Sequence, residues 1–134
     1  MDVVIDTNVL IASLLKDSVT RKLLSSNNIN FYIPEFSINE IEKYKLYLID
    51  KSELSKDEFD ELFELIIQNI NIIPYEDVKN YIPQAMEIMK DIDIKDSPFI
   101  ACALYLKCGI FSYDEDFQRQ SVVKLYKISE LLEI

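Results

Sequence analysis

The chain contains no histidine among its 134 residues. This absence excludes sites in which an imidazole activates a serine or cysteine nucleophile, and it excludes zinc held mainly by nitrogen ligands. The two cysteines, Cys102 and Cys108, lie six residues apart on a predicted helix and therefore face different directions. We expect neither a disulfide nor a zinc site from them. Any hydrolytic chemistry must rely on carboxylates, lysines or a bound metal ion.

Glycine and long apolar runs are also scarce. One Gly and four Pro give no low-complexity linker, and no internal repeat is visible, so we expect a single domain over residues 1–134. No uncharged run reaches the ~18 residues that a membrane span needs. No basic leader resembling a signal peptide is present. The expectation is a cytoplasmic protein with no membrane association.

Short apolar segments alternate with amphipathic ones along the chain. The periodicity predicts strands at 3–5, 31–33, 71–73, 110–112 and 123–126. It predicts helices at 9–15, 35–50, 55–69, 76–90, 96–108 and 128–132, with a further short helix capped by Asp17 or Ser18. Pro83 is expected at a kink or a helix start, and Gly109 at a helix end. This alternation predicts a three-layer α/β fold with a mostly parallel sheet of about five strands flanked by helices.

Four acids interrupt the apolar pattern at junctions between elements. Asp6 and Asp114 follow the first and fourth predicted strands, Glu40 lies early in the helix after the second strand, and Asp96 begins the helix before the fourth. Asp96 also looks like an ideal helix cap. Ligands of open parallel sheets lie beyond the carboxyl ends of the strands. If the first and fourth strands are neighbours, all four carboxylates converge on one edge.

Such convergence has an electrostatic cost. At ~5 Å and an effective dielectric constant of ~20, each carboxylate pair repels by roughly 3 kcal/mol, so several pairs rival the ~5–15 kcal/mol stability of a domain. Protonation would reduce the repulsion. Oxygen-only ligands of this kind are also what Mg²⁺ and Mn²⁺ prefer, and two such ions would balance four negative charges. The sequence therefore favours a divalent-metal site.

Four motifs in this order resemble those of the PIN-domain ribonucleases, including the toxin members of toxin–antitoxin pairs, and the match covers nearly the whole chain. The motifs are Val4-Ile5-Asp6-Thr7-Asn8-Val9-Leu10, Ile38-Asn39-Glu40-Ile41, Asp96-Ser97-Pro98-Phe99-Ile100-Ala101 and Ser112-Tyr113-Asp114-Glu115-Asp116-Phe117. The resemblance implies a PIN-like fold and a Mg²⁺- or Mn²⁺-dependent endoribonuclease that hydrolyses RNA phosphodiester bonds, either the toxin of a pair or an RNA-processing nuclease.

The resemblance also implies roles for individual residues. Asp6, Glu40, Asp96 and Asp114 would be the catalytic, metal-binding set, with Asp116 as a fifth member acting through metal or water. Family members differ in which acid of the fourth motif approaches the metal, so the choice between Asp114 and Asp116 stays open. The residues expected to support this set are Thr7, Asn8, Ser112 and Asp93.

The net charge bears on the expected RNA substrate. The chain has 24 acids against 14 bases, a formal charge of −10, and affinity for nucleic acid depends on Lys and Arg that neutralise phosphates. We therefore expect weak RNA binding that depends on Mg²⁺. The candidate contacts to the RNA backbone near the active edge are Lys16, Arg21, Lys22, Lys95 and Arg119.

Other interpretations remain open. An aspartyl phosphatase would use Asp6 as a nucleophile, but it normally has a second Asp where this chain has Asn8. A catalytically inactive PIN-like interaction module would bind a partner without cutting RNA. The family resemblance further implies an antitoxin protein as partner and a homodimer as the assembly.

Overall fold

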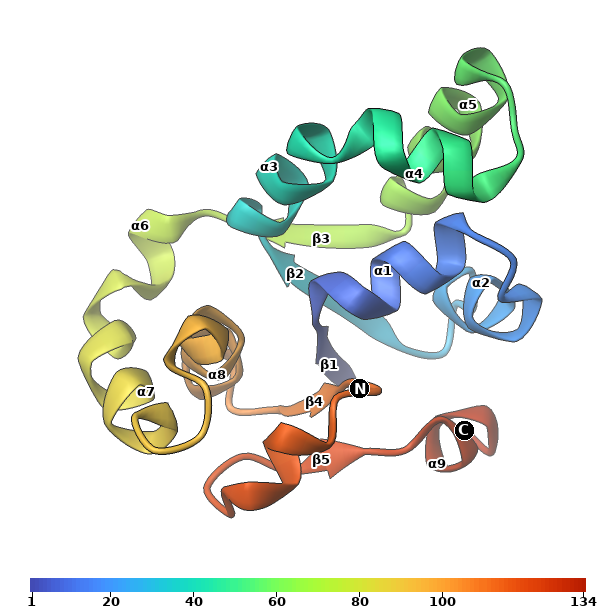
Figure 1. The fold of residues 1–134 in the computed structure, drawn as a ribbon. Coiled ribbons are helices and arrows are strands. Elements are labelled where there is room, and N and C mark those ends of the chain that lie inside the picture. The colour runs from blue at the N-terminus through green and yellow to red at the C-terminus, as the bar shows by residue number, and fades with distance from the viewer.

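The computed structural model describes residues 1–134 and arranges them around a single β-sheet (Figure 1). The strands are β1 (Asp2–Ile5), β2 (Asn30–Pro34), β3 (Ile70–Ile73), β4 (Gly109–Phe111) and β5 (Leu125–Tyr126). The α-helices are α1 (Thr7–Leu14), α2 (Ser18–Leu24), α3 (Glu35–Lys43), α4 (Lys45–Ser52), α5 (Lys56–Ile67), α6 (Tyr75–Val78), α7 (Ile82–Met89), α8 (Ser97–Leu106) and α9 (Ile128–Leu132). Three 3₁₀ turns cover Lys79–Tyr81, Ile94–Asp96 and Glu115–Arg119.

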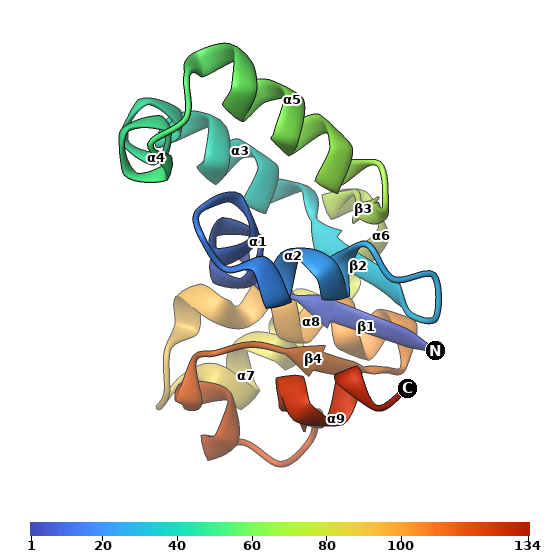
Figure 2. The ribbon, with the colours of Figure 1, turned by 90° about the vertical axis from the view of Figure 1, so that its right-hand side faces the viewer.

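The sheet has five strands in the order β3-β2-β1-β4-β5, and every neighbouring pair is parallel. The chain builds outward from β1 to β2 and β3, then crosses to the other side of β1 to add β4 and β5. The order therefore reverses between β1 and β4, where the crossovers diverge and an open α/β sheet binds its ligands. In Figure 2 both chain termini lie at the other end of the strands, where β1 begins.

Two apolar clusters cover the two faces of the sheet. Val3, Ile5 and Phe31 contribute to a cluster with residues of α1 to α5 and α9, whereas Val4 and Ile110 join a cluster with α6, α7 and α8. Successive residues of a strand point to opposite faces, which explains why neighbours in β1 belong to different clusters. Figure 1 shows these helices on the two sides of the sheet. The predicted three-layer α/β fold is confirmed.

Local signals explain most helix boundaries. Asp17 caps α2 by accepting a hydrogen bond from the Thr20 N–H at 3.0 Å, and Ser55 and Glu58 form a reciprocal capping box at the start of α5. Pro83 lies in the first turn of α7, where its missing N–H costs nothing. Cys102 and Cys108 are both free thiols. None of the helices combines the length and the apolar character needed to cross a membrane.

Some predicted boundaries are wrong. The helix predicted at 35–50 is two helices separated at Tyr44, although neither Gly nor Pro occurs there. After the break, Lys45 at the start of α4 forms an ion pair with Asp60 of α5 at 2.6 Å. Gly109 belongs to β4, because α8 ends at Lys107 in the left-handed conformation (φ 56°). The last strand contains only Leu125–Tyr126.

Candidate metal centre

Asp6 connects β1 to α1 at the point where the strand order reverses. Ile5 is in register with Phe111 of β4, so the next residues, Asp6 and Ser112, lie side by side. One carboxylate oxygen of Asp6 accepts a hydrogen bond from the Val9 N–H at 3.0 Å, and the other accepts one from the Ser112 hydroxyl at 2.5 Å. A carboxylate has about four acceptor positions, so each oxygen keeps one for a ligand.

The Asp6 side chain is only 4% exposed, and burial is the main reason why its pKa lies above the ordinary value for Asp. The hydrogen bonds from Ser112 and Val9 oppose this increase, whereas the negative charge of Asp114 adds to it. A buried carboxylate next to a like charge is stabilised either by a proton or by a cation.

The fourth motif forms a tight turn after β4. Ser112 Oγ accepts a hydrogen bond from the Asp114 N–H at 2.9 Å, and Asp114 Oδ1 accepts one from the Asp116 N–H, also at 2.9 Å. Ser112 therefore links the turn to Asp6, as a supporting residue would. The negative charge of Asp114 raises the pKa of both Asp6 and Asp96, and the negative charge of Asp116 raises the pKa of Asp96.

Asp96 occupies the cap position of α8, but its side chain does not cap the helix, which corrects the prediction. Its Oδ2 atom is buried and has no hydrogen-bond partner. Burial raises the pKa of Asp96 to about 7, and the charges of Asp93, Asp114, Asp6 and Asp116 contribute in that order. The side chain is thus held in the cavity rather than against its own backbone, with an oxygen that lacks a partner.

Three acids meet most closely. Asp93, Asp96 and Asp116 bring one carboxylate oxygen each to within 4.8 Å of one another. Asp93, predicted only as a supporting residue, thus lies in the tightest group, where its Oδ1 also accepts the Lys95 N–H at 3.1 Å. The 3₁₀ turn Ile94–Asp96 brings Asp93 and Asp96 together, because residues three apart lie on the same side of such a turn.

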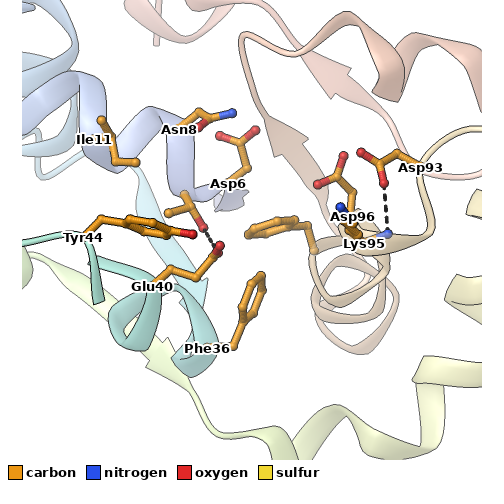
Figure 3. Close-up of a pocket in the computed structure, with 11 residues that line it drawn as sticks. Asp6, Asn8, Ile11, Phe36, Glu40, Tyr44, Asp93, Lys95 and Asp96 are labelled. Atoms are coloured by element: carbon orange, nitrogen blue, oxygen red, sulfur yellow. Dashed lines mark hydrogen bonds between the residues drawn. The ribbon is translucent and has the colours of Figure 1, made fainter. Parts of the chain in front are cut away.

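Glu40 belongs to the opposite wall. Figure 3 shows Asp6 between Glu40 on α3 and the pair Asp93 and Asp96. Thr7 Oγ1 lies 3.1 Å from Glu40 Oε1 and 2.7 Å from the hydroxyl of Ser37, a fully buried residue that sequence reasoning missed. Ser37 lies one turn before Glu40 on the same helix, and residues three apart are neighbours on a helix surface. This spacing was the signal in the sequence that could have predicted Ser37 near the site.

Four of these acids, Asp6, Glu40, Asp93 and Asp96, line a cavity of about 520 Å³, whereas Asp114 and Asp116 do not line it. The supporting candidates Thr7 and Asn8 also line it, and Figure 3 shows Asn8 beside Asp6. Sequence reasoning missed its apolar wall, because those side chains come from three helices and look like ordinary core positions. The wall consists of Ile11, Phe36, Tyr44 and Phe99. The rings of Phe36 and Phe99 lie 5.2 Å apart between centroids and join α3 to α8.

The predicted basic residues are mostly elsewhere. Only Lys95 lines the cavity. Lys16 forms an ion pair with Glu53 at 2.9 Å, and Arg21 donates to the carbonyl oxygens of Ser13 and Leu15, both at 2.9 Å.

Lys16, Arg21 and Lys22 were expected near the active edge. None of the three lines the acidic cavity: Lys16 follows the end of α1, and Arg21 and Lys22 belong to α2. Arg119 is exposed and donates to the carbonyl of Asp91 at 3.1 Å.

The fold and site define an α/β domain that gathers carboxylates at the reversal point of a parallel sheet. A family model described as "PIN domain" matches residues 4–131, and the chain belongs to the PIN-domain family. No curated protein matches the sequence. A similar fold occurs in the crystal structure of VapBC2 from Rickettsia felis bound to a DNA fragment from their promoter. That match is 18% identical with a TM-score of 0.71, and it covers 95% of this chain and 98% of that chain.

Proposed function

We infer that this protein is a divalent-metal-dependent endoribonuclease that hydrolyses RNA phosphodiester bonds. The catalytic, metal-binding residues in this proposal are Asp6, Glu40, Asp96 and Asp114, with Asp116 as a further ligand. The observation that carries it is the buried, unpartnered Oδ2 of Asp96 in the same cavity as the buried carboxylate of Asp6. Membership of the PIN-domain family supports the same conclusion.

The residues fit a hard cation. Every titratable donor assigned to the site is a carboxylate, and Mg²⁺ and Mn²⁺ favour oxygen ligands. The pKa values of Asp6 and Asp96 are raised, so the protein groups around them compensate the charged forms only in part. A divalent cation bound by these oxygens would supply this compensation, an activated water and a charge to stabilise the leaving oxygen.

The protein groups orient the reacting parts. Val9 and Ser112 fix both oxygens of Asp6, so their remaining acceptor positions have a defined direction. Thr7 holds Glu40 on the opposite wall, across the space in which a phosphate would lie (Figure 3). Phe36 and Phe99 close the apolar side of the cavity and limit the water that reaches it.

The direct test begins with protein stripped of metal by EDTA. We expect it to cleave end-labelled RNA only after Mn²⁺ or Mg²⁺ is added. Failure to cleave any RNA in stoichiometric Mn²⁺ would contradict the proposal. Calorimetry then separates the alternatives, because an inactive interaction module shows no specific binding of divalent cations. Trapping a phosphorylated Asp6 would instead indicate an aspartyl phosphatase.

The biological setting belongs to the same proposal. We infer a cytoplasmic nuclease that is the toxin of a toxin–antitoxin pair, with an antitoxin protein as partner and a homodimer as the assembly. The resemblance of its four motifs to toxin members supports this, and so does the similarity of its fold to a chain of VapBC2. Co-purification with the product of a neighbouring gene, followed by relief of toxicity when both are expressed, tests it.

A further inference from the structure

A second hollow adjoins the acidic cavity. It has a volume of about 470 Å³ and is lined by apolar side chains of α1 and α4 with one lysine, Lys51. Ile11 and Tyr44 line both hollows, so the acidic cavity continues into the second one at the junction of α3 and α4. Tyr44 stands at this junction, and Tyr47 lies one helical turn further along α4. A long substrate bound at the acids would pass over these side chains.

The two tyrosines are exposed and each has a lysine over its ring. Tyr44 is 51% and Tyr47 is 61% exposed. Lys43 Nζ lies 5.4 Å from the ring centre of Tyr44, and Lys51 Nζ lies 5.7 Å from that of Tyr47. We call the surface formed by these four residues the α3–α4 ledge.

The ledge lysines differ from many others in this acidic chain, because neither Lys43 nor Lys51 forms an ion pair with a carboxylate. Six other lysines do so, namely Lys16, Lys45, Lys56, Lys79, Lys90 and Lys124. Uncompensated positive charge beside exposed aromatic rings is the combination that binds single-stranded nucleic acid, since bases stack on the rings and cations contact the phosphates. A purely apolar protein partner would not require these charges.

We propose that the α3–α4 ledge binds the single-stranded RNA next to the cleaved phosphate, with bases on Tyr44 and Tyr47 and phosphates at Lys43 and Lys51. This inference rests on the proposed nuclease function and names its substrate class. Bases within a duplex are stacked on each other and cannot lie on the tyrosine rings, so the ledge selects unpaired RNA. It also supplies positive charge that Lys16, Arg21 and Lys22 do not bring to the cavity.

The test measures binding separately from cleavage. Fluorescence anisotropy of a labelled oligouridine is recorded with Ca²⁺, an oxygen-preferring cation that lacks the strict octahedral geometry of Mg²⁺. A gel confirms that the RNA stays intact. Tyr44→Leu and Tyr47→Leu should each weaken binding by roughly tenfold. The matched control is Tyr75→Leu, because Tyr75 is 54% exposed but lines neither hollow, and it should bind like wild type.

The lysines are tested by their effect on the salt dependence of RNA binding. The double variant Lys43→Gln/Lys51→Gln should reduce the slope of log affinity against log salt by roughly 0.7 for each lysine. A control double variant, Lys107→Gln/Lys127→Gln, removes two other exposed lysines without ion pairs and should keep the wild-type slope. An RNA duplex should bind more weakly than the oligouridine, and this preference should disappear in Tyr44→Leu/Tyr47→Leu.

The possible outcomes separate the two proposals. Wild-type affinity in the tyrosine variants, or equal losses in the controls, would overturn the ledge even if the protein cleaves RNA. Ledge-dependent binding without cleavage in Mn²⁺ would support the ledge and contradict the nuclease. If the tyrosine variants keep their affinity for RNA but change from dimer to monomer in sedimentation, the ledge is a protein interface and the RNA proposal is wrong.

Discussion

The acidic cavity and the α3–α4 ledge beside it are built in opposite ways. In the acidic cavity, Asp6 is almost fully buried, and its two oxygens accept hydrogen bonds from Val9 on α1 and from Ser112, the residue after β4. On the ledge, Tyr44 and Tyr47 are more than half exposed. Buried and cross-linked groups suit chemistry, which needs defined geometry, whereas exposed rings suit a flexible substrate. We therefore expect changes to the acids to affect metal binding and the cleavage rate, and changes to the ledge to affect the affinity for RNA.

The largest effect is expected for Asp6→Asn. It removes a charge from the proposed metal site, and the several kcal/mol that a metal ion contributes correspond to a loss of about 10³-fold in cleavage rate. The matched control is Asp2→Asn, at the other end of the same strand, where the carboxylate accepts a hydrogen bond from Asn30. Single-turnover cleavage of labelled RNA measures both. Equal activity of Asp6→Asn and wild type would exclude Asp6 from the reaction.

A smaller loss should follow Ser112→Ala. The variant loses the hydroxyl that orients Asp6 and leaves the Asp114 N–H without its acceptor. Removing such a partner of a metal ligand typically lowers metal affinity by about 10–100-fold. Calorimetric titration with Mn²⁺ measures it. Ser13→Ala provides the control, because Ser13 is also buried and its hydroxyl donates only to the carbonyl of Leu10. A similar decrease in both variants would show that general destabilisation is the cause.

The third prediction concerns pH. Burial and the neighbouring acids raise the pKa of Asp96 to about 7, and a metal binds only the deprotonated carboxylate. Affinity for Mn²⁺ should therefore rise about tenfold between roughly pH 6 and pH 8. Asp91→Asn, which removes a nearby exposed acid, should leave this dependence unchanged. A flat profile in wild type would contradict the assignment.

Metal-free protein should show the corresponding effect on stability. Native Asp96 has a pKa of about 7 and holds its proton up to that pH, whereas in the unfolded chain its pKa is the ordinary 3.8. The unfolded state thus binds fewer protons in this window, so the free energy of unfolding contributed by this group falls as pH rises from about 4 to about 7. Urea titrations of wild type and Asp96→Asn measure the difference, which should be greatest above the folded pKa.

The smallest effect on cleavage is expected for Arg21→Ala. Arg21 donates to two carbonyl oxygens at the end of α1, so its loss should lower the free energy of unfolding by roughly 1–3 kcal/mol. Folded protein should keep its RNA affinity, in contrast to the ledge variants. Unchanged stability together with weaker RNA binding would return Arg21 to the substrate-binding residues. Thermal denaturation and anisotropy, run on the same samples, decide between them.

Local chemistry made much of the fold predictable. The alternation of short strands and helices, the cap at Asp17 and the start of α5 at Ser55 are all encoded within a few residues, and the structure agrees. The break at Tyr44 has no such local signal, because neither Gly nor Pro occurs there. The end of α8 was misplaced because a lysine, not the nearby Gly109, adopts the left-handed conformation.

The candidate site shows the same limit. Asp6 and Ser112 were predictable as neighbours, because adjacent parallel strands place their carboxyl ends together. The approach of Asp93 to Asp96 and Asp116 depends on a 3₁₀ turn and on a loop from another part of the chain, which spacing alone does not reveal. The apolar wall was missed because Phe36 and Phe99 have the periodicity of core residues, and only the tertiary structure shows that they border a cavity.

A crystal grown in Mn²⁺ tests the central claim most directly. Anomalous scattering locates the ions without any assumption about activity. The account predicts at least one Mn²⁺ at a ligand distance of roughly 2.1 Å from a carboxylate oxygen of Asp6, with further ligands from Asp96 and from Asp114 or Asp116. Peaks only at other acids, or no peak in this cavity at saturating Mn²⁺, would contradict it.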